Sequence, residues 1–165
     1  MNFRRGSYGD VEQLRLLGLA SWKQYQANLT PDNWQKLFNN LNRTETYAEL
    51  LTQSHCIVSE NAAGAIIGMA FLVPRGNPTD IFQADWSYLR YVTVHPDFSG
   101  LGIGRQLTEM CIEIAKRNKE HTVALHTSEM MHKARHIYEK LGFTILREIE
   151  PRQGKKYWLY TLAIA

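Results

Sequence analysis

The spacing of hydrophobic residues along the chain changes from a helical period to strand-like runs, and then alternates between the two. In the first third, apolar side chains recur every third or fourth residue, which is typical of helices with one buried face. Asp10 and Thr30-Pro31 are suitable helix starts, since an N-cap oxygen accepts free N–H groups and proline fits the first turn. The predicted helices begin near Asp10 and at Pro31, and cover about 46–53, 103–118 and 134–141.

Other segments are apolar and rich in β-branched or aromatic residues, without a helical period, and turn residues separate them. The predicted strands cover 55–59, 65–73, 86–94, 122–126, 143–149 and 156–164. Helices therefore come first, an antiparallel meander follows, and the second half alternates strands with helices. This order predicts an α/β (α+β) fold in which helices flank a mixed sheet.

Length and composition predict one folded domain over residues 1–165. The chain is 44% hydrophobic and 21% charged, which is enough apolar material for a sizeable core. The net charge of +3 is small and no basic tract is interleaved with aromatic residues, so nucleic acid is not an expected partner. The longest apolar stretch, 62–73, is shorter than the roughly 20 residues that a membrane span needs, so no membrane partner is expected.

The two cysteines, Cys56 and Cys111, belong to neither a CxxC pair nor a Cys/His ligand spacing. Residues 6–10 are polar where a secretion signal would continue with an apolar run. We therefore expect a soluble, cytoplasmic protein. His132 and His136 lie four residues apart on a predicted helix, but with no third ligand we expect them to face solvent and expect no metal site.

The most informative segment joins the predicted strand 86–94 to the predicted helix 103–118. Glycines at 100, 102 and 104 stand where that helix begins, and free N–H groups meet the positive end of the helix dipole at such a point. A diphosphate can approach a backbone without side chains, and Arg105 can add a charge-assisted hydrogen bond. Three glycines can also make only a tight turn. A dinucleotide fingerprint does not fit, because Arg105 stands where it needs a glycine, and no P-loop run is present.

The segment resembles the acyl-CoA-binding motif of the GNAT (GCN5-related) N-acetyltransferases, Gln/Arg-x-x-Gly-x-Gly/Ala. Gly102 and Gly104 match, while Ser99 stands at the first position. A second stretch, Met131-x-x-Ala134-x-x-x-Tyr138-x-x-x-Gly142-Phe143, is similar to the family's second signature except at Met131, where the family has Asn. The resemblance is strong over about 71–143 and rests on element order elsewhere.

The resemblance implies a mostly antiparallel sheet of about six to seven strands, with a splayed parallel pair that holds the cofactor. It also implies acetyl-CoA as co-substrate and a primary amine, on a small molecule or a peptide, as acceptor. The backbone N–H near Val92 is the implied oxyanion donor. Tyr138 is the implied general acid, although a core tyrosine is also ordinary on that apolar helix face. The implied cofactor-binding residues are Val92, Thr93, Val94, Ser99, Gly100, Leu101, Gly102, Ile103, Gly104, Arg105, Thr127, Ala134 and Tyr138.

The general base stays open between Asp85 and Glu129, each of which is also an ordinary surface carboxylate, and a water chain can replace either. The loop 74–85 and the helices within 31–53 are expected on the acceptor side, where Asp80 and Asp85 favour a cationic acceptor.

Two further interpretations remain open. The departures at Ser99 and Met131 are compatible with a non-catalytic acyl-CoA-binding module, and an enzyme for a longer acyl chain is a third reading. The apolar last strand, 158–164, suggests an exposed edge that can pair in a homodimer.

Overall fold

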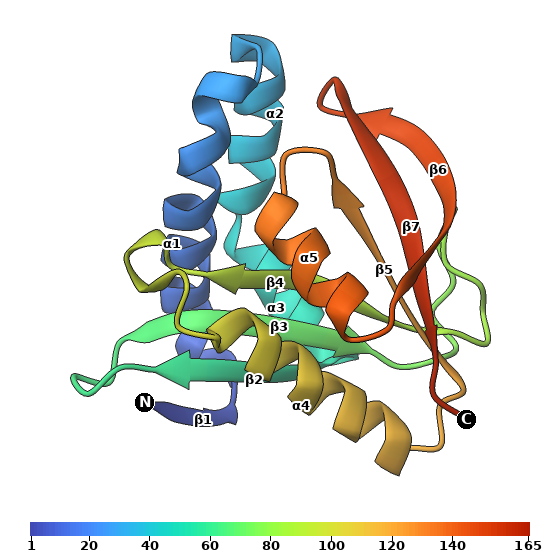
Figure 1. The fold of residues 1–165 in the computed structure, drawn as a ribbon. Coiled ribbons are helices and arrows are strands. Elements are labelled where there is room, and N and C mark those ends of the chain that lie inside the picture. The colour runs from blue at the N-terminus through green and yellow to red at the C-terminus, as the bar shows by residue number, and fades with distance from the viewer.

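The computed structural model describes residues 1–165 as a seven-stranded sheet with helices on both faces (Figure 1). The strands are β1 (Asn2–Arg5), β2 (His55–Glu60), β3 (Ile66–Val73), β4 (Ser87–Val94), β5 (Thr122–Ser128), β6 (Thr144–Arg152) and β7 (Lys155–Ala163). The helices are α1 (Val11–Trp22), α2 (Pro31–Leu41), α3 (Thr44–Gln53), α4 (Ile103–Arg117) and α5 (His132–Lys140), with short 3-10 helices at Tyr8–Asp10, Lys23–Asn28 and Pro96–Phe98.

The strand order is β1-β2-β3-β4-β5-β7-β6, and every neighbouring pair is antiparallel except β4–β5. This confirms the predicted α/β fold with a mixed, mostly antiparallel sheet and one parallel pair. None of the helices is long and apolar enough to cross a membrane.

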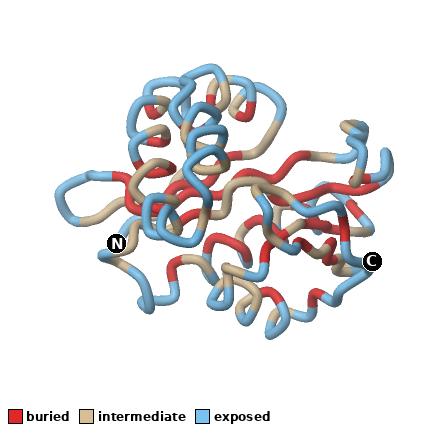
Figure 2. The backbone as a smooth tube through the Cα atoms, turned by 90° about the horizontal axis from the view of Figure 1, so that it is seen from above, coloured by how far each residue is buried: buried red, intermediate tan, exposed pale blue.

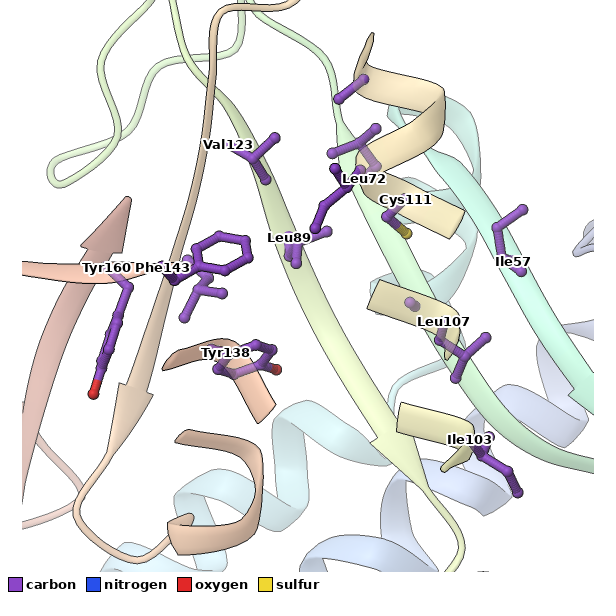
Figure 3. Close-up of a cluster of buried hydrophobic side chains, with 14 of the residues drawn as sticks. Ile57, Leu72, Leu89, Ile103, Leu107, Cys111, Val123, Tyr138, Phe143 and Tyr160 are labelled. Atoms are coloured by element: carbon purple, nitrogen blue, oxygen red, sulfur yellow. The ribbon is translucent and has the colours of Figure 1, made fainter. Parts of the chain in front are cut away.

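Strand β3 is buried along its whole length, because helices cover both of its faces. On one face, Leu107 and Cys111 of α4 belong to the core cluster that Figure 3 shows; on the other, Leu14 of α1 and Tyr47 of α3 form a second cluster. A strand buried on both sides has no polar face, so residues 66–73 read as one continuous apolar run. Figure 2 shows buried backbone running through the middle of the molecule, with exposed residues on its outside.

Local signals place the starts of α2 and α4 where the sequence predicts them. The Thr30 side chain accepts a hydrogen bond from the Asn33 N–H at 3.2 Å, and Pro31 occupies the first turn of α2. Helix α4 starts after Gly102, whose φ of 81° lies in the left-handed region that glycine adopts without strain.

Three features differ from the sequence-based expectations. The Asp10 carboxylate does not cap α1, because it accepts hydrogen bonds from Arg4 and from the Ser7 N–H instead. Strand β1 was not predicted, because its four residues show no alternation and are held by pairing with β2 at one edge of the sheet. The expectation that the last strand lies at an exposed edge is wrong. Strand β7 lies between β5 and β6, because the turn at Gln153-Gly154 folds β6 to the outside, so β1 and β6 are the edges.

Candidate active site

A cleft opens where β4 and β5 separate. The two strands pair only at Ser87–Val123 and Tyr88–Ala124, and beyond these residues they diverge toward their C-terminal ends (Figure 3). A β-bulge bends β4 in the same region. Its partner β3 pairs Phe71 with Arg90 and Met69 with Thr93, so one residue of β3 faces two of β4, Tyr91 and Val92. Bulges re-aim backbone and side-chain groups and are common beside active sites.

The bulge is held by its own contacts. Tyr91 has a φ of 50°, a left-handed conformation that costs a non-glycine residue about 1–3 kcal/mol. The Thr93 hydroxyl donates a hydrogen bond to the Tyr91 carbonyl at 2.9 Å, and the Tyr91 ring packs 6.0 Å from that of Tyr47. The fold therefore fixes the backbone at Val92, and nothing in the sequence indicated this strained position.

Most residues that line the cleft fall into two groups, which we call the Tyr138 side and the α2 side. The Tyr138 side consists of Val92, Thr93, Thr127, Met131, Ala134 and Tyr138. The α2 side consists of Trp22, Leu37, Asn40, Arg90, His126, Arg152, Gln153 and Tyr157. The hairpin tip between β6 and β7 lies against α2, since a Cβ on Gly154 would meet the Asn33 amide at 3.1 Å. The structure thus brings together, on the Tyr138 side, five of the residues that the family resemblance implied.

The glycine turn at the start of α4 presents free backbone donors. No N–H group of residues 100–105 donates a hydrogen bond within the protein, and the first donor of the helix is Gln106 N, to the Gly102 carbonyl at 3.0 Å. A Cβ on Gly100 or Gly102 would meet nothing within 4 Å, so the outside of the turn is open. Such a turn can bind an anion through its N–H groups and the helix dipole. Because a Cβ on Gly104 would lie 3.6 Å from both Val94 and Ile137, the turn adjoins the end of β4 and the helix α5.

Lys133 supplies a positive charge beside this turn. Its Nζ lies 3.1 Å from the Oγ of Ser99, the residue that stands where the family motif has Arg or Gln. Arg105 instead forms an ion pair with Glu109 at 2.8 Å, so its guanidinium lies along α4. Only the fold brings Lys133 and Ser99 together, and the sequence carried no signal for the pair.

Tyr138 places a neutral phenol in the cleft. Its ring packs at 5.8 Å from that of Phe143, and Figure 3 shows it between β5 and β4 with the hydroxyl directed toward β4. The hydroxyl has no hydrogen-bond partner within the protein, and burial raises the pKa of Tyr138 above its ordinary value of 10.0. A protonated phenol with an uncommitted O–H therefore faces the cleft.

Three further groups on the α2 side were missed by the sequence analysis. The Nδ1 of His126 and the Nε of Arg152 are buried without a hydrogen-bond partner. Burial, together with the charges of Arg152 and Arg90, lowers the pKa of His126 to about 3, so its imidazole is neutral at pH 7. Charged or imidazole side chains within otherwise apolar strands are unusual, and that was the available signal for Arg90 and His126.

The carboxylates considered as bases lie outside the cleft lining. Asp85 is 3.3 Å from the Nε2 of His121, beside the N-terminal end of β5, whereas the cleft lies at its C-terminal end. Glu129 accepts a hydrogen bond from the Lys156 N–H at 2.7 Å. Asp80 is 82% exposed and lies 3.9 Å from Arg152. The loop 74–85 therefore contributes no carboxylate to the cleft, whereas α1 and α2 do form part of its wall.

Two other predictions about single residues agree with the structure. Cys111 is fully buried in the core cluster, where burial raises the pKa of its thiol to about 12. His132 and His136 are exposed on α5.

Sequence comparison finds relatives among acyltransferases. A profile described as the acetyltransferase (GNAT) family matches residues 19–143. The "Probable N-acetyltransferase camello" of Xenopus tropicalis is 25% identical over 115 residues, which cover 69% of this chain and 50% of the relative. The "L-amino acid N-acyltransferase MnaT" of Escherichia coli (strain K12) is 31% identical over 70 residues, 41% of this chain and 40% of the relative. The chain thus spans half or less of the curated relatives that it matches.

Solved structures share the fold over almost the whole chain. The PaiA N-acetyltransferase from Thermoplasma acidophilum, in complex with coenzyme A, has a TM-score of 0.80 at 16% identity, with 99% of this chain and 98% of that one covered. The structure of yncA from Salmonella typhimurium with acetyl-CoA has a TM-score of 0.69 at 20% identity, covering 99% and 93% of the two chains. At these identities the likeness establishes the fold.

Proposed function

The chain belongs to the acetyltransferase (GNAT) family, and from that premise we propose that it transfers the acetyl group of acetyl-CoA to a primary amine. One observation carries the proposal. A single cleft has a turn of free N–H groups adjoining one end, a buried protonated phenol in its wall, and a second side open to another reactant. The names of both sequence relatives refer to acyl transfer to nitrogen, and two of the structural neighbours hold coenzyme A or acetyl-CoA.

The residues present fit the parts of an acyl-CoA. The free N–H groups of residues 100–105 would receive the diphosphate, with Lys133 beside them. The pantetheine arm would lie along the edge of β4 that β5 leaves unpaired after Tyr88, as an added strand does. The thioester would then lie at the bulge, where we propose that the Val92 N–H stabilises the oxyanion. Acetyl-CoA supplies an activated carbonyl: the amine nitrogen bonds to the acetyl carbon, and the carbon–sulfur bond breaks.

Tyr138 is the proposed proton donor to the leaving sulfur. Burial raises the pKa of the phenol, which by itself makes it a weaker acid. Apolar surroundings disfavour a thiolate for the same reason, so a thiolate released beside the phenol is more basic than in water and takes a proton more readily.

We propose that the proton that the amine loses leaves through water in the cleft. His126 lines the cleft, but burial and the charges of Arg152 and Arg90 lower its pKa to about 3 and its Nδ1 is buried, so its imidazole is too weak a base and too enclosed to take that proton. Asp85 and Glu129, the earlier candidates, are engaged by His121 and by the Lys156 N–H outside the cleft lining. A base must come within about 3 Å of the proton that it removes, or reach it through one water.

Free-thiol release from acetyl-CoA, measured across a panel of primary amines, tests the proposal. We expect amine-dependent thiol release, with the acetylated amine identified by mass spectrometry in equal amount. The alternative, a non-catalytic acyl-CoA-binding module, predicts calorimetric binding of acetyl-CoA without release for any amine. Release from a longer acyl-CoA at a higher rate would instead assign a longer acyl chain.

The Lys133→Ala variant is expected to bind acetyl-CoA about 3–10-fold more weakly, since an exposed charge contact contributes about 0.2–1 kcal/mol and a charge-assisted hydrogen bond somewhat more. Calorimetry at low and high salt measures this, and the loss should shrink as salt increases. Lys140→Ala removes the same charge from the last turn of α5 and is the matched control. Equal affinities for the two variants would show that Lys133 does not replace the diphosphate contact that is lost because Ser99 stands where the family motif has Arg or Gln.

Three assignments remain predictions. We treat residues 1–165 as a single acetyltransferase domain, and we expect a cytoplasmic location. A homodimer also remains a prediction, although β7 does not offer the edge on which it was based. Light scattering of the purified chain would measure the oligomeric state.

A further inference from the structure

The α2 side of the cleft carries positive charge, and no carboxylate lines it. Arg90, from β4, and Arg152, from the end of β6, both line it, and no Asp or Glu does. His126, which lines the same cleft, is neutral at pH 7. The second reactant would therefore enter a site with two guanidinium groups and no anion.

Neither guanidinium is fully engaged within the protein. Arg90 lies 5.5 Å from the centre of the Tyr91 ring and pairs with no carboxylate. Arg152 has a buried Nε without a partner, and its nearest carboxylate, Asp80, is exposed and 3.9 Å away. The Nε itself is enclosed, so a ligand would contact the terminal nitrogens of this side chain, which is 36% exposed. Both charges act at one place, since both lower the pKa of His126.

We propose that the acceptor is a small amino acid, a molecule whose carboxylate binds Arg90 and Arg152 while its amine faces the bulge at Val92. The inference rests on the proposed acetyl transfer and names the substrate class for that site. Guanidinium groups bind carboxylates through two parallel hydrogen bonds, which fixes orientation as well as affinity. Arg90 directly precedes the bulge residues. In an amino acid the amine is only a few atoms from the carboxylate, so a carboxylate bound by Arg90 places the amine near Val92.

The remaining wall indicates an apolar side chain on this amino acid. Trp22 and Leu37, from α1 and α2, and Tyr157, from β7, line the same side. Diamines and polyamines do not fit, because their second ammonium would lie against Arg90 and Arg152, and the carboxylate nearest to Arg152, the exposed Asp80, lies outside the cleft lining. Juxtaposed like charges in a recognition site cost several kcal/mol.

The test compares matched acceptors in the thiol-release assay. The probes are leucine, methionine and phenylalanine, their carboxamides, and 1,5-diaminopentane. We expect kcat/KM for the acids to exceed that for the amides at least about 10-fold, and the diamine to be the poorest acceptor. The amide's amine is less basic than that of the free amino acid, so a preference for the acid cannot come from a larger fraction of neutral amine. Amides or the diamine reacting as fast as the acids would overturn the inference while leaving the proposed function in place.

Variants then locate the carboxylate. Arg90→Gln and Arg152→Gln are each expected to raise KM for the acids about 10–100-fold with a much smaller change in kcat, since they remove binding shared by ground and transition states. The KM for the amides should change less than about 3-fold, because the amides lack the negative charge of the carboxylate. Arg147→Gln, which removes an exposed arginine from the same hairpin outside the cleft, is the matched control.

Misfolding of the variants and failure of the proposed function can each be distinguished from a wrong assignment of the two arginines. Neither arginine has a strong partner within the protein, so thermal unfolding and acetyl-CoA affinity should match those of the unmodified chain. If acetyl-CoA binds but no amine of any charge releases thiol, the proposed function fails and this inference with it. If acids react but Arg90→Gln and Arg152→Gln leave their KM unchanged, the assignment of the two arginines is wrong.

Discussion

The Gly102→Glu variant is expected to bind acetyl-CoA at least about 100-fold more weakly than the unmodified chain, a loss of about 2.7 kcal/mol. The substitution places a carboxylate at the turn where the N–H groups of residues 100–105 are free. It would compete for those donors and repel the diphosphate, and two charges about 4 Å apart near a protein surface interact by about 4 kcal/mol. Isothermal calorimetry with acetyl-CoA measures the effect.

Backbone strain must be separated from this electrostatic effect, because Gly102 has a φ of 81°. A residue with a Cβ in that conformation lowers stability by about 1–2 kcal/mol. Gly64→Glu is the matched control, since Gly64 has the same φ, lies in the β2–β3 turn, and has nothing within 4 Å of its Cβ position. Both variants should lose similar stability, but only Gly102→Glu should lose affinity. Equal affinity for the two would show that the diphosphate does not bind at this turn.

The parts of the site that the sequence predicted are those set by local signals. The glycines at 100, 102 and 104 act within one turn, so their spacing alone predicted the start of α4. Likewise, Thr30-Pro31 predicted the start of α2, and the continuous apolar run of β3 predicted a strand buried on both faces. Each of these signals needs only neighbouring residues or one element's period.

The parts that were missed depend on contacts between distant segments. Lys133 meets Ser99 only because α5 packs beside the glycine turn. Arg90, His126 and Arg152 come from three strands and meet because β6 and β7 fold back over the cleft toward α2. The charge of the acceptor side therefore could not be inferred from Asp80 and Asp85, which are near in sequence to β4 but outside the cleft. The pairing of the strands and the direction of the β6–β7 hairpin determine which charged residues line the acceptor side.

The Tyr138→Phe variant is expected to lower kcat about 100-fold or more while leaving the Kd for acetyl-CoA within about 2-fold, since proton transfer by one positioned group contributes about 10²–10⁴-fold. The hydroxyl has no partner within the protein, so its removal should not lower the free energy of unfolding. Because burial raises the pKa of Tyr138 above 10.0, no loss of activity below pH 10 should come from its ionisation. Steady-state thiol release, calorimetry and thermal unfolding measure the three quantities.

Tyr160, a second tyrosine in the same core cluster, is the control, because its Phe variant should lose stability and keep its kcat. The Tyr160 hydroxyl donates to Glu139 at 2.7 Å and accepts from Arg135 at 3.0 Å, outside the cleft lining. Tyr160→Phe should therefore lose about 1–3 kcal/mol of stability while keeping kcat within about 2-fold. A tyrosine that only packs in the core would give Tyr138→Phe an unchanged kcat. That result would contradict the acid role, because the free hydroxyl of Tyr138 is the one feature that separates it from an ordinary core side chain.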